Sequence, residues 1–190
     1  RLVADRRLAA RTPLDPDLVL ADYRRRGARY YTALAQVVDL EPDDVATRGH
    51  LPAEIVDRVL GQDLDASFLR GSLRGYQAFG ARFALVQRRV VLGDEMGLGK
   101  TVQAIAVLCH LAATGVRHAL VVCPAGVLVN WSREVAQFST LPVRLLYGDD
   151  REATHATWIA EGGVGLTTFD GLQRVDPESA DGVRLGCLVV

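Results

Sequence analysis

The sequence predicts an α/β protein, built on a parallel β-sheet with helices on both faces and preceded by a small helical region. From about residue 70, short apolar runs alternate with amphipathic segments of helical length. Strands buried on both faces of a parallel sheet have this continuously apolar character. Before residue 70, short amphipathic segments look helical. We therefore expect a helical N-terminal region, residues 1–70, of unknown role, and an α/β domain over residues 71–190.

The N-terminal region contains two helix signals. Asp15 can cap a helix that begins at Pro16 and runs through LVLADYRRRGARYYTALAQVV, because proline is favoured in the first turn of a helix. A second helix begins within LPAEIVDRVL, residues 51–60. The run from Arg24 to Arg26 could contact nucleic acid, but a charge run on a helix is more often a solvated face. We assign it no function.

The α/β domain is expected to contain five strands and four helices. The strands are RVVLG (89–93), HALVVCP (118–124), VRLLY (143–147), VGLTTF (164–169) and GCLVV (186–190). The helices are expected at 74–88, 100–114, 126–138 and 150–161. The last strand reaches Val190 without a cap or polar tail, and the first residue is not Met. We therefore expect a piece of a longer chain, with a domain that is incomplete at its C-terminal end.

The composition excludes several classes of protein. With 49% hydrophobic and 24% charged residues, the chain has the mixture of a globular protein. Its longest apolar stretch is shorter than the roughly 18 residues that cross a membrane, and no export signal is visible, so we expect a cytoplasmic protein with no membrane partner. The three cysteines form no CxxC pair and look like buried apolar side chains. The net charge of −1 means that nucleic acid could be bound only through a local patch or through protein outside this chain.

One segment carries a phosphate-binding pattern. The apolar run RVVLG leads into DEMGLGKT, residues 94–101, and then into the apolar helix TVQAIAVLCHLAA. This is the strand, glycine loop and helix order of a P-loop. Gly97 and Gly99 let backbone N–H groups point at phosphate oxygens, and the helix N-terminus adds partial positive charge. Lys100, the single lysine of the chain, would reach the β- and γ-phosphates, and the Thr101 hydroxyl would bind Mg²⁺.

Two other interpretations of this loop are weaker. A glycine turn that only caps a helix is disfavoured by the strand and helix on either side. A dinucleotide-binding loop is disfavoured because the glycines do not complete GxGxxG and no acidic residue follows about 20 residues later. The loop alone therefore predicts only that a nucleotide and Mg²⁺ bind here, with Lys100 and Thr101 as the catalytic residues and Thr101 as the metal ligand; the family resemblance given below implies that the nucleotide is ATP. The predicted nucleotide-binding residues of the loop are Asp94, Glu95, Met96, Gly97, Leu98, Gly99, Lys100 and Thr101.

Residues 70–190 resemble the sucrose-non-fermenting group of helicase-like ATPases, the chromatin-remodeller group of helicase superfamily two. DEMGLGKT is close to that family's form of the loop, so Asp94 is expected where the general pattern GxxxxGK[ST] has glycine. LRGYQAFGARFAL (73–85) resembles the family's glutamine-containing motif, which implies that the Gln77 amide contacts the adenine edge. Without the neighbouring loop, Gln77 would more simply be a polar residue on an amphipathic helix. The resemblance implies the first of two RecA-like lobes, with the P-loop NTPase fold.

Two further segments resemble the family's DNA-contacting blocks. LVVCPAGVLVNWSREVAQF (120–138) implies contacts from Pro124, Ala125 and the following helix N-terminus. VGLTTFDGL (164–172) implies that the hydroxyls of Thr167 and Thr168 contact phosphates of the tracked strand, although β-branched residues in a strand explain them equally well. LLYGDDR (145–151) matches the strand and glycine turn between these blocks. Trp131 could stack on a base, but a tryptophan on such a helix is more often a core residue.

The resemblance implies that the full protein is an ATP hydrolase, a DNA-dependent translocase that moves along double-stranded DNA and remodels protein–DNA complexes. In the family an Asp-Glu pair follows the strand that LGCLVV resembles, and an arginine finger comes from the second RecA-like lobe. These 190 residues contain neither group, so we expect them alone to be inactive in turnover.

Two alternatives stay open. The first is a superfamily-two helicase that acts on RNA or single strands, and the second is a non-catalytic ATPase-like scaffold. The location implied by the family is the nucleoid if the source is bacterial and the nucleus if it is eukaryotic. The sequence does not define an oligomeric state.

Overall fold

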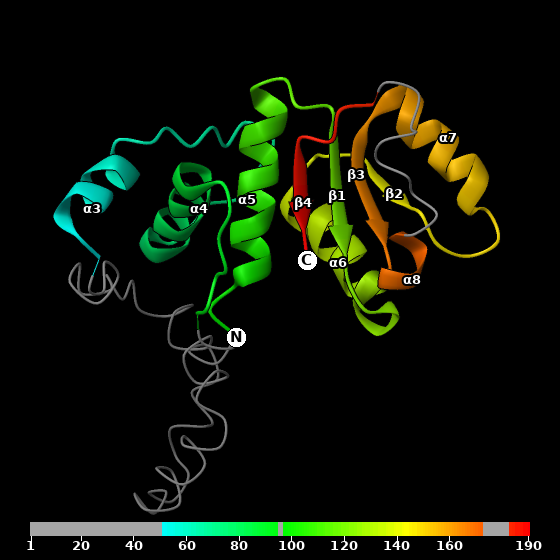
Figure 1. Ribbon diagram of the computed structural model, residues 1–190, viewed down its shortest axis with the longest axis horizontal. Helices are drawn as coiled ribbons and strands as arrows, with labels where there is room; N and C mark the ends of the chain where they lie inside the picture. The colour runs from blue at the N-terminus through cyan, green and yellow to red at the C-terminus, as the bar shows by residue number, and fades with distance from the viewer. Residues whose placement is uncertain (1–50, 95–96, 173–182) are drawn as a thin grey trace, which may run out of the picture.

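The computed structural model describes residues 51–94, 97–172 and 183–190, so the helix expected after Asp15 and the run Arg24 to Arg26 lie outside the described residues. A parallel sheet of four strands, in the order β2-β3-β1-β4, forms its centre (Figure 1). The strands are β1 His118–Val122, β2 Val143–Leu145, β3 Gly163–Thr167 and β4 Cys187–Val189. The helices are α3 Ala53–Leu60, α4 Gly75–Gln87, α5 Lys100–Ala113, α6 Ala125–Phe138, α7 Arg151–Glu161 and α8 Phe169–Leu172. The expected parallel α/β class is confirmed, and α4 to α7 lie close to their expected ranges.

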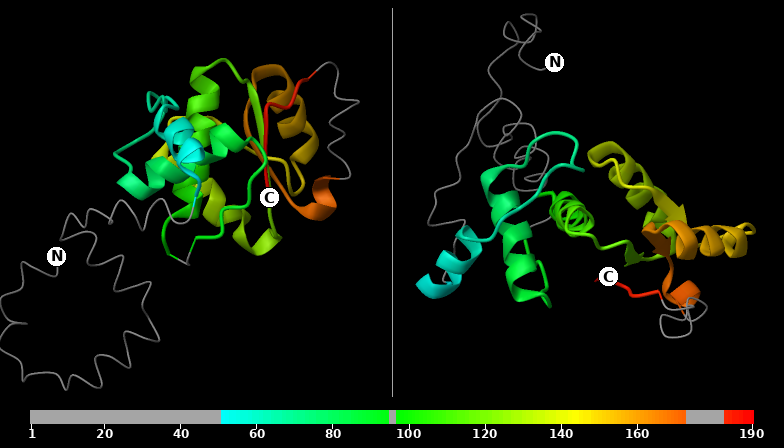
Figure 2. Two further views of the ribbon diagram at one scale, coloured as in Figure 1. Left: turned by 60° about the vertical axis from the view of Figure 1, so that its left-hand side comes forward. Right: turned by 90° about the horizontal axis from the view of Figure 1, so that it is seen from above.

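Helices cover both faces of the sheet, with α5 and α6 on one face and α7 on the other (Figures 1 and 2). Strand β1 is buried along its whole length, and its side chains alternate between the two cores, as the pleat of a strand requires. Val121 packs with α5 and α6, whereas Leu120 and Val122 pack with Trp158 of α7. Trp131 of α6 is half-buried against the first core, which confirms its interpretation as a packing residue.

Residues before 70 pack against the α/β elements. Val56 and Val59 of α3 form a small buried cluster with Phe79 of α4. The backbone N–H of Arg70 donates to the carbonyl of Phe138 at the end of α6, at 2.7 Å. The described part of the N-terminal region is therefore attached both to α4 and to the layer that covers the sheet.

The prediction of a strand at residues 89–93 is wrong. This segment follows α4 without pairing to any described strand, and Val91 is 92% exposed. A strand needs a neighbour that accepts and donates its backbone hydrogen bonds. The described part of β4 pairs with β1 alone. The apolar side chains of RVVLG favour burial, but burial alone does not make a strand. A strand also needs a neighbouring strand that bonds to its backbone.

The cysteines behave as small apolar side chains, as expected. Cys109 and Cys123 are buried, and Cys187 is half-buried beside the first core. Burial disfavours the charged thiolate and raises the pKa of Cys109 to about 11, so this thiol stays protonated at neutral pH. Among the described helices, none is long and apolar enough to cross a membrane.

The core under α7 depends on a glycine in the middle of β3. Trp158 is buried against Gly165, and its indole N–H donates to the carbonyl of Gly163 at 3.1 Å. A Cβ at Gly165 would lie 3.2 Å from the indole and 3.0 Å from a methyl carbon of Leu146. The ring therefore lies directly on the strand backbone.

We expect Gly165→Ala to destabilise the full-length protein by about 1 to 3 kcal/mol, because overpacking forces neighbouring side chains out of their preferred rotamers. Chemical denaturation measures the change. Gly126→Ala is the matched control, since a Cβ at Gly126 would meet no atom within 4 Å. Equal unfolding free energies for the two variants would contradict this account of the core.

Candidate functional site

The glycine loop lies directly before α5. Gly97 and Gly99 have φ angles of +88° and +78°, in the left-handed region that residues with a side chain rarely adopt. Gly99 is the N-cap of α5, and no side chain among the described residues caps this end of the helix. The first turn of this 14-residue helix therefore has no capping side chain from the part of the chain that the structure describes, and its partial positive charge favours an anion.

Lys100 and Thr101 occupy the first turn of α5. The Lys100 ammonium donates to the backbone carbonyl of Asp94 at 2.7 Å, so its side chain reaches from the helix to the start of the loop. Thr101 is half-buried in the same turn. Its hydroxyl and the phosphate oxygens of a bound nucleotide are the hard oxygen ligands that Mg²⁺ prefers. The residues present therefore fit the predicted nucleotide and metal. Glu95 and Met96 lie outside the described residues.

Gln77 is brought to the loop from α4, 21 residues earlier in the chain. Its amide oxygen accepts from the backbone N–H of Arg74 at 3.1 Å, and its amide nitrogen donates to the carbonyl of Leu98 at 3.4 Å, a long hydrogen bond. A Cβ at Gly99 would lie 2.5 Å from that nitrogen. The predicted adenine-contacting glutamine therefore lies against the predicted phosphate-binding glycine.

Sequence reasoning missed a second glutamine at the loop. Gln103, one turn into α5, is fully buried, and its amide nitrogen donates to the Asp94 carboxylate at 2.7 Å. The available signal was a polar residue within the apolar helix TVQAIAVLCHLAA. Periodicity alone does not show which partner such a residue meets.

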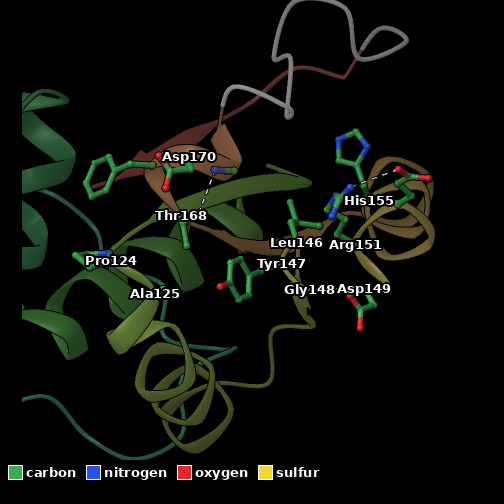
Figure 3. Close-up of a pocket in the computed structure, with 13 residues that line it drawn as sticks. Pro124, Ala125, Leu146, Tyr147, Gly148, Asp149, Arg151, His155, Thr168 and Asp170 are labelled. Carbon is green, nitrogen blue, oxygen red and sulfur yellow. Dashed lines mark hydrogen bonds and ion pairs between the residues drawn. The ribbon is translucent and has the colours of Figure 1, made fainter.

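A cavity of about 620 Å³ opens at the carboxyl ends of β1, β2 and β3 (Figure 3). This is the edge at which open α/β sheets bind their ligands. Three of the four predicted DNA-contact residues, Pro124, Ala125 and Thr168, line it. The other lining residues are Leu146, Tyr147, Gly148, Asp149, Arg151, Glu152, His155, Phe169, Asp170 and Gly171.

The two predicted threonine contacts have different surroundings. Thr167 is fully buried, and its hydroxyl donates to the carbonyl of Leu146 at 3.3 Å, which joins β3 to the segment after β2. The Thr168 hydroxyl lines the cavity and accepts from the backbone N–H of Gly171 at 3.0 Å. The structure therefore brings Thr168 to the cavity and holds Thr167 beneath it.

Sequence reasoning also missed Arg151 as a site residue. Arg151 is the first residue of α7, lines the cavity and is exposed. Its guanidinium lies 3.8 Å from the Glu152 carboxylate, a distance typical of a weak surface ion pair. The turn GDDR after an apolar strand was the signal, since it sets a guanidinium at the carboxyl edge of the sheet.

Comparison with known proteins identifies the family. Residues 23–186 match the model of the SNF2-related domain. The chain belongs to the SNF2-related domain family. The match starts upstream of the boundary expected at residue 70 and includes both the loop and the cavity residues.

Several known proteins are similar to this member of the SNF2-related family. The CHD3-type chromatin-remodeling factor CHR7 of Arabidopsis thaliana is 39% identical over 100 residues, which are 50% of this chain and 8% of the relative. The Xenopus tropicalis SWI/SNF-related matrix-associated actin-dependent regulator of chromatin subfamily A containing DEAD/H box 1 is 40% identical over 109 residues, 52% of this chain and 11% of the relative. The chain thus spans about a tenth of the length of these relatives.

One solved structure gives the same fold. It is the Sulfolobus solfataricus SWI2/SNF2 ATPase core in complex with dsDNA, with 30% identity and a TM-score of 0.50. The likeness covers 60% of this chain and 25% of the other. The P-loop NTPase fold of the RecA-like type, expected from the resemblance, is confirmed by this neighbour.

We expect Gly99→Ala to weaken nucleotide binding by the full-length protein about tenfold or more. The left-handed conformation costs alanine about 1 to 2 kcal/mol, and the added methyl would also displace the Gln77 amide. Titration with a fluorescent adenine nucleotide measures the change. Gly93→Ala is the control at the other side of the loop, where a Cβ would meet no atom within 4 Å. Equal affinities for the two variants would contradict the role given to Gly99.

Proposed function

We propose that the full-length protein is an ATP-driven translocase on double-stranded DNA, and that this chain supplies its ATP-binding lobe. The observation that carries the proposal is the pair of left-handed glycines, Gly97 and Gly99, with Lys100 and Thr101 directly after Gly99 in the first turn of α5. Membership of the SNF2-related family and the likeness to an ATPase core in complex with dsDNA support the substrate assignment.

In this proposal the loop backbone and Lys100 bind the phosphates of ATP. The Lys100 ammonium exchanges the Asp94 carbonyl for the β- and γ-phosphates, because a compact charge on a long stem can make this move without a change of backbone. The Gln77 amide would leave the Leu98 carbonyl and contact the adenine edge. Its present hydrogen bond to Leu98 is long, so the exchange costs little.

Thr101 would hold Mg²⁺, which supplies charge neutralisation at the transferring phosphate when bound. The chain's own contribution is to orient that phosphate at the beginning of α5. The acidic pair and arginine finger that complete phosphoryl transfer are proposed to lie in the rest of the protein, since this chain covers only a quarter of the solved ATPase core.

DNA is proposed to lie across the cavity at the carboxyl edge. Thr168, Pro124 and Ala125 would contact one strand there, and Arg151 would pair with a phosphate. Thr167 would fix the strand end on which Thr168 stands. Contacts of this kind position a duplex without reading its sequence, as movement along any DNA requires. The proposed location is wherever genomic DNA lies, in the nucleoid or the nucleus.

We expect the full-length protein to hydrolyse ATP, with strong stimulation by double-stranded DNA and weak stimulation by RNA or single strands. Lys100→Ala should lower the stimulated rate about 100-fold or more, as the loss of one charge-stabilising group commonly does. A steady-state phosphate-release assay measures this. Stimulation by RNA alone would favour the single-strand or RNA helicase, and absence of turnover with intact nucleotide binding would favour the scaffold.

We expect Arg151→Ala to raise the DNA concentration needed for half-maximal ATPase stimulation several-fold. Loss of one phosphate contact should also reduce the slope of log affinity against log salt concentration by about 1. Arg117→Ala removes the same charge directly before β1, at the opposite edge of the sheet, and should behave as wild type. Equal effects of the two changes would contradict DNA binding at the cavity.

A further inference from the structure

A buried amide connects α5 to the first residue of the glycine loop. Gln103 is fully buried, and its amide nitrogen lies 2.7 Å from a carboxylate oxygen of Asp94. An ionised carboxylate can only accept hydrogen bonds, so the NH₂ group must face Asp94. The amide oxygen consequently faces the other way, toward α4.

The position of that oxygen is unusual. It has no hydrogen-bond partner among the described residues, although it is buried. It occupies the place where a side chain at Gly80 would begin: a Cβ there would lie 2.1 Å from the oxygen and 2.9 Å from the amide carbon. Gln103 can adopt this conformation only because Gly80, in the middle of α4, has no side chain.

This arrangement does not favour stability. Burying an unpaired carbonyl oxygen costs free energy, and an apolar side chain of the same shape at such a site is commonly neutral or stabilising. Glycine in the middle of a helix is also destabilising relative to alanine. The unpaired Gln103 oxygen in α5 and the glycine at position 80 in α4 are therefore both unfavourable for stability. Both accompany the single hydrogen bond from Gln103 to Asp94.

Asp94 accepts two hydrogen bonds in this structure, one at its backbone carbonyl and one at its carboxylate. Its backbone carbonyl accepts from Lys100 at 2.7 Å, and its carboxylate accepts from Gln103 at 2.7 Å. When Lys100 turns to phosphate, as in the proposed function, the first of these bonds is lost. The bond from Gln103 does not involve Lys100 and can persist, so it can keep the start of the loop fixed while the nucleotide enters.

We propose that Gln103 is a positioning residue for nucleotide binding, which acts through Asp94 and for which Gly80 provides the space. The inference rests on the proposed nucleotide-binding function of the loop. Gln103 itself is fully buried, so it would act through Asp94 and not by touching the nucleotide. Its effect is to hold the start of the loop at Asp94, both before and after Lys100 has moved.

The first test is Gln103→Met in the full-length protein, because methionine has nearly the same length and volume and no donor. We expect the KM for ATP, and the dissociation constant of a non-hydrolysable ATP analogue, to rise about 5- to 20-fold. The kcat at saturating ATP and DNA should stay within about twofold, and the thermal unfolding temperature should be unchanged or higher.

Gly80→Ala supplies an independent test from the opposite helix. The new methyl should push the Gln103 amide away from Asp94 and weaken nucleotide binding to a similar degree. In a Gln103→Ala background there is no amide to displace, so Gly80→Ala should weaken binding no further and should raise the unfolding temperature. Gly75→Ala, on the same helix and with no atom within 4 Å of its Cβ, is the control and should bind nucleotide as wild type.

The outcomes separate this inference from the function on which it rests. If wild type binds ATP and Lys100→Ala does not, but Gln103→Met and Gly80→Ala bind as wild type, the positioning role is overturned and the function stands. If Gln103→Met loses affinity, kcat and thermal stability together, the residue is only structural and the inference is also overturned. If wild type binds no magnesium nucleotide, both fail.

Discussion

The close approach of α4 and α5 is the constraint on which the loop depends. Each helix contributes a glutamine whose amide occupies the space beside a glycine: Gln77 of α4 lies against Gly99, and Gln103 of α5 lies against Gly80. The two amides reach different parts of the loop, at Leu98 and Asp94. The conformation of the loop is therefore set by the packing of two helices as well as by its own glycines.

The sheet imposes a second constraint, because its strands are parallel and all end at one edge. Strand β1 leads to Pro124 and Ala125, the segment after β2 leads to Arg151, and β3 leads to Thr168. The buried hydroxyl of Thr167 ties β3 to Leu146, so the two turns keep a fixed spacing. A cavity built in this way is rigid at its base, although its rim is made of loops and helix ends.

Sequence patterns predicted the features that local chemistry determines. The four helices and four of the five strands followed from apolar periodicity, and the loop followed from its glycines and single lysine. The features that these patterns missed depend on partners distant in sequence. RVVLG looks like a strand, yet it pairs with no described strand. Gln103 looks like a misplaced polar residue until Gly80 and Asp94 are seen beside it.

The loop and the cavity share one edge of the molecule. In Figure 1 the beginning of α5 lies at the same side of the sheet as the arrowheads of β1 and β3 and the short helix α8. The strand and helix order of the fold requires this, since β1 runs back against the direction of α5. The two sites adjoin different cores: α5, which follows the loop, packs in the core shared with α6, whereas Leu146 of the cavity packs in the core under α7. Strand β1 contributes side chains to both cores. In the proposed function, β1 is therefore the element through which a shift at one site would reach the other, because protein interiors are close-packed.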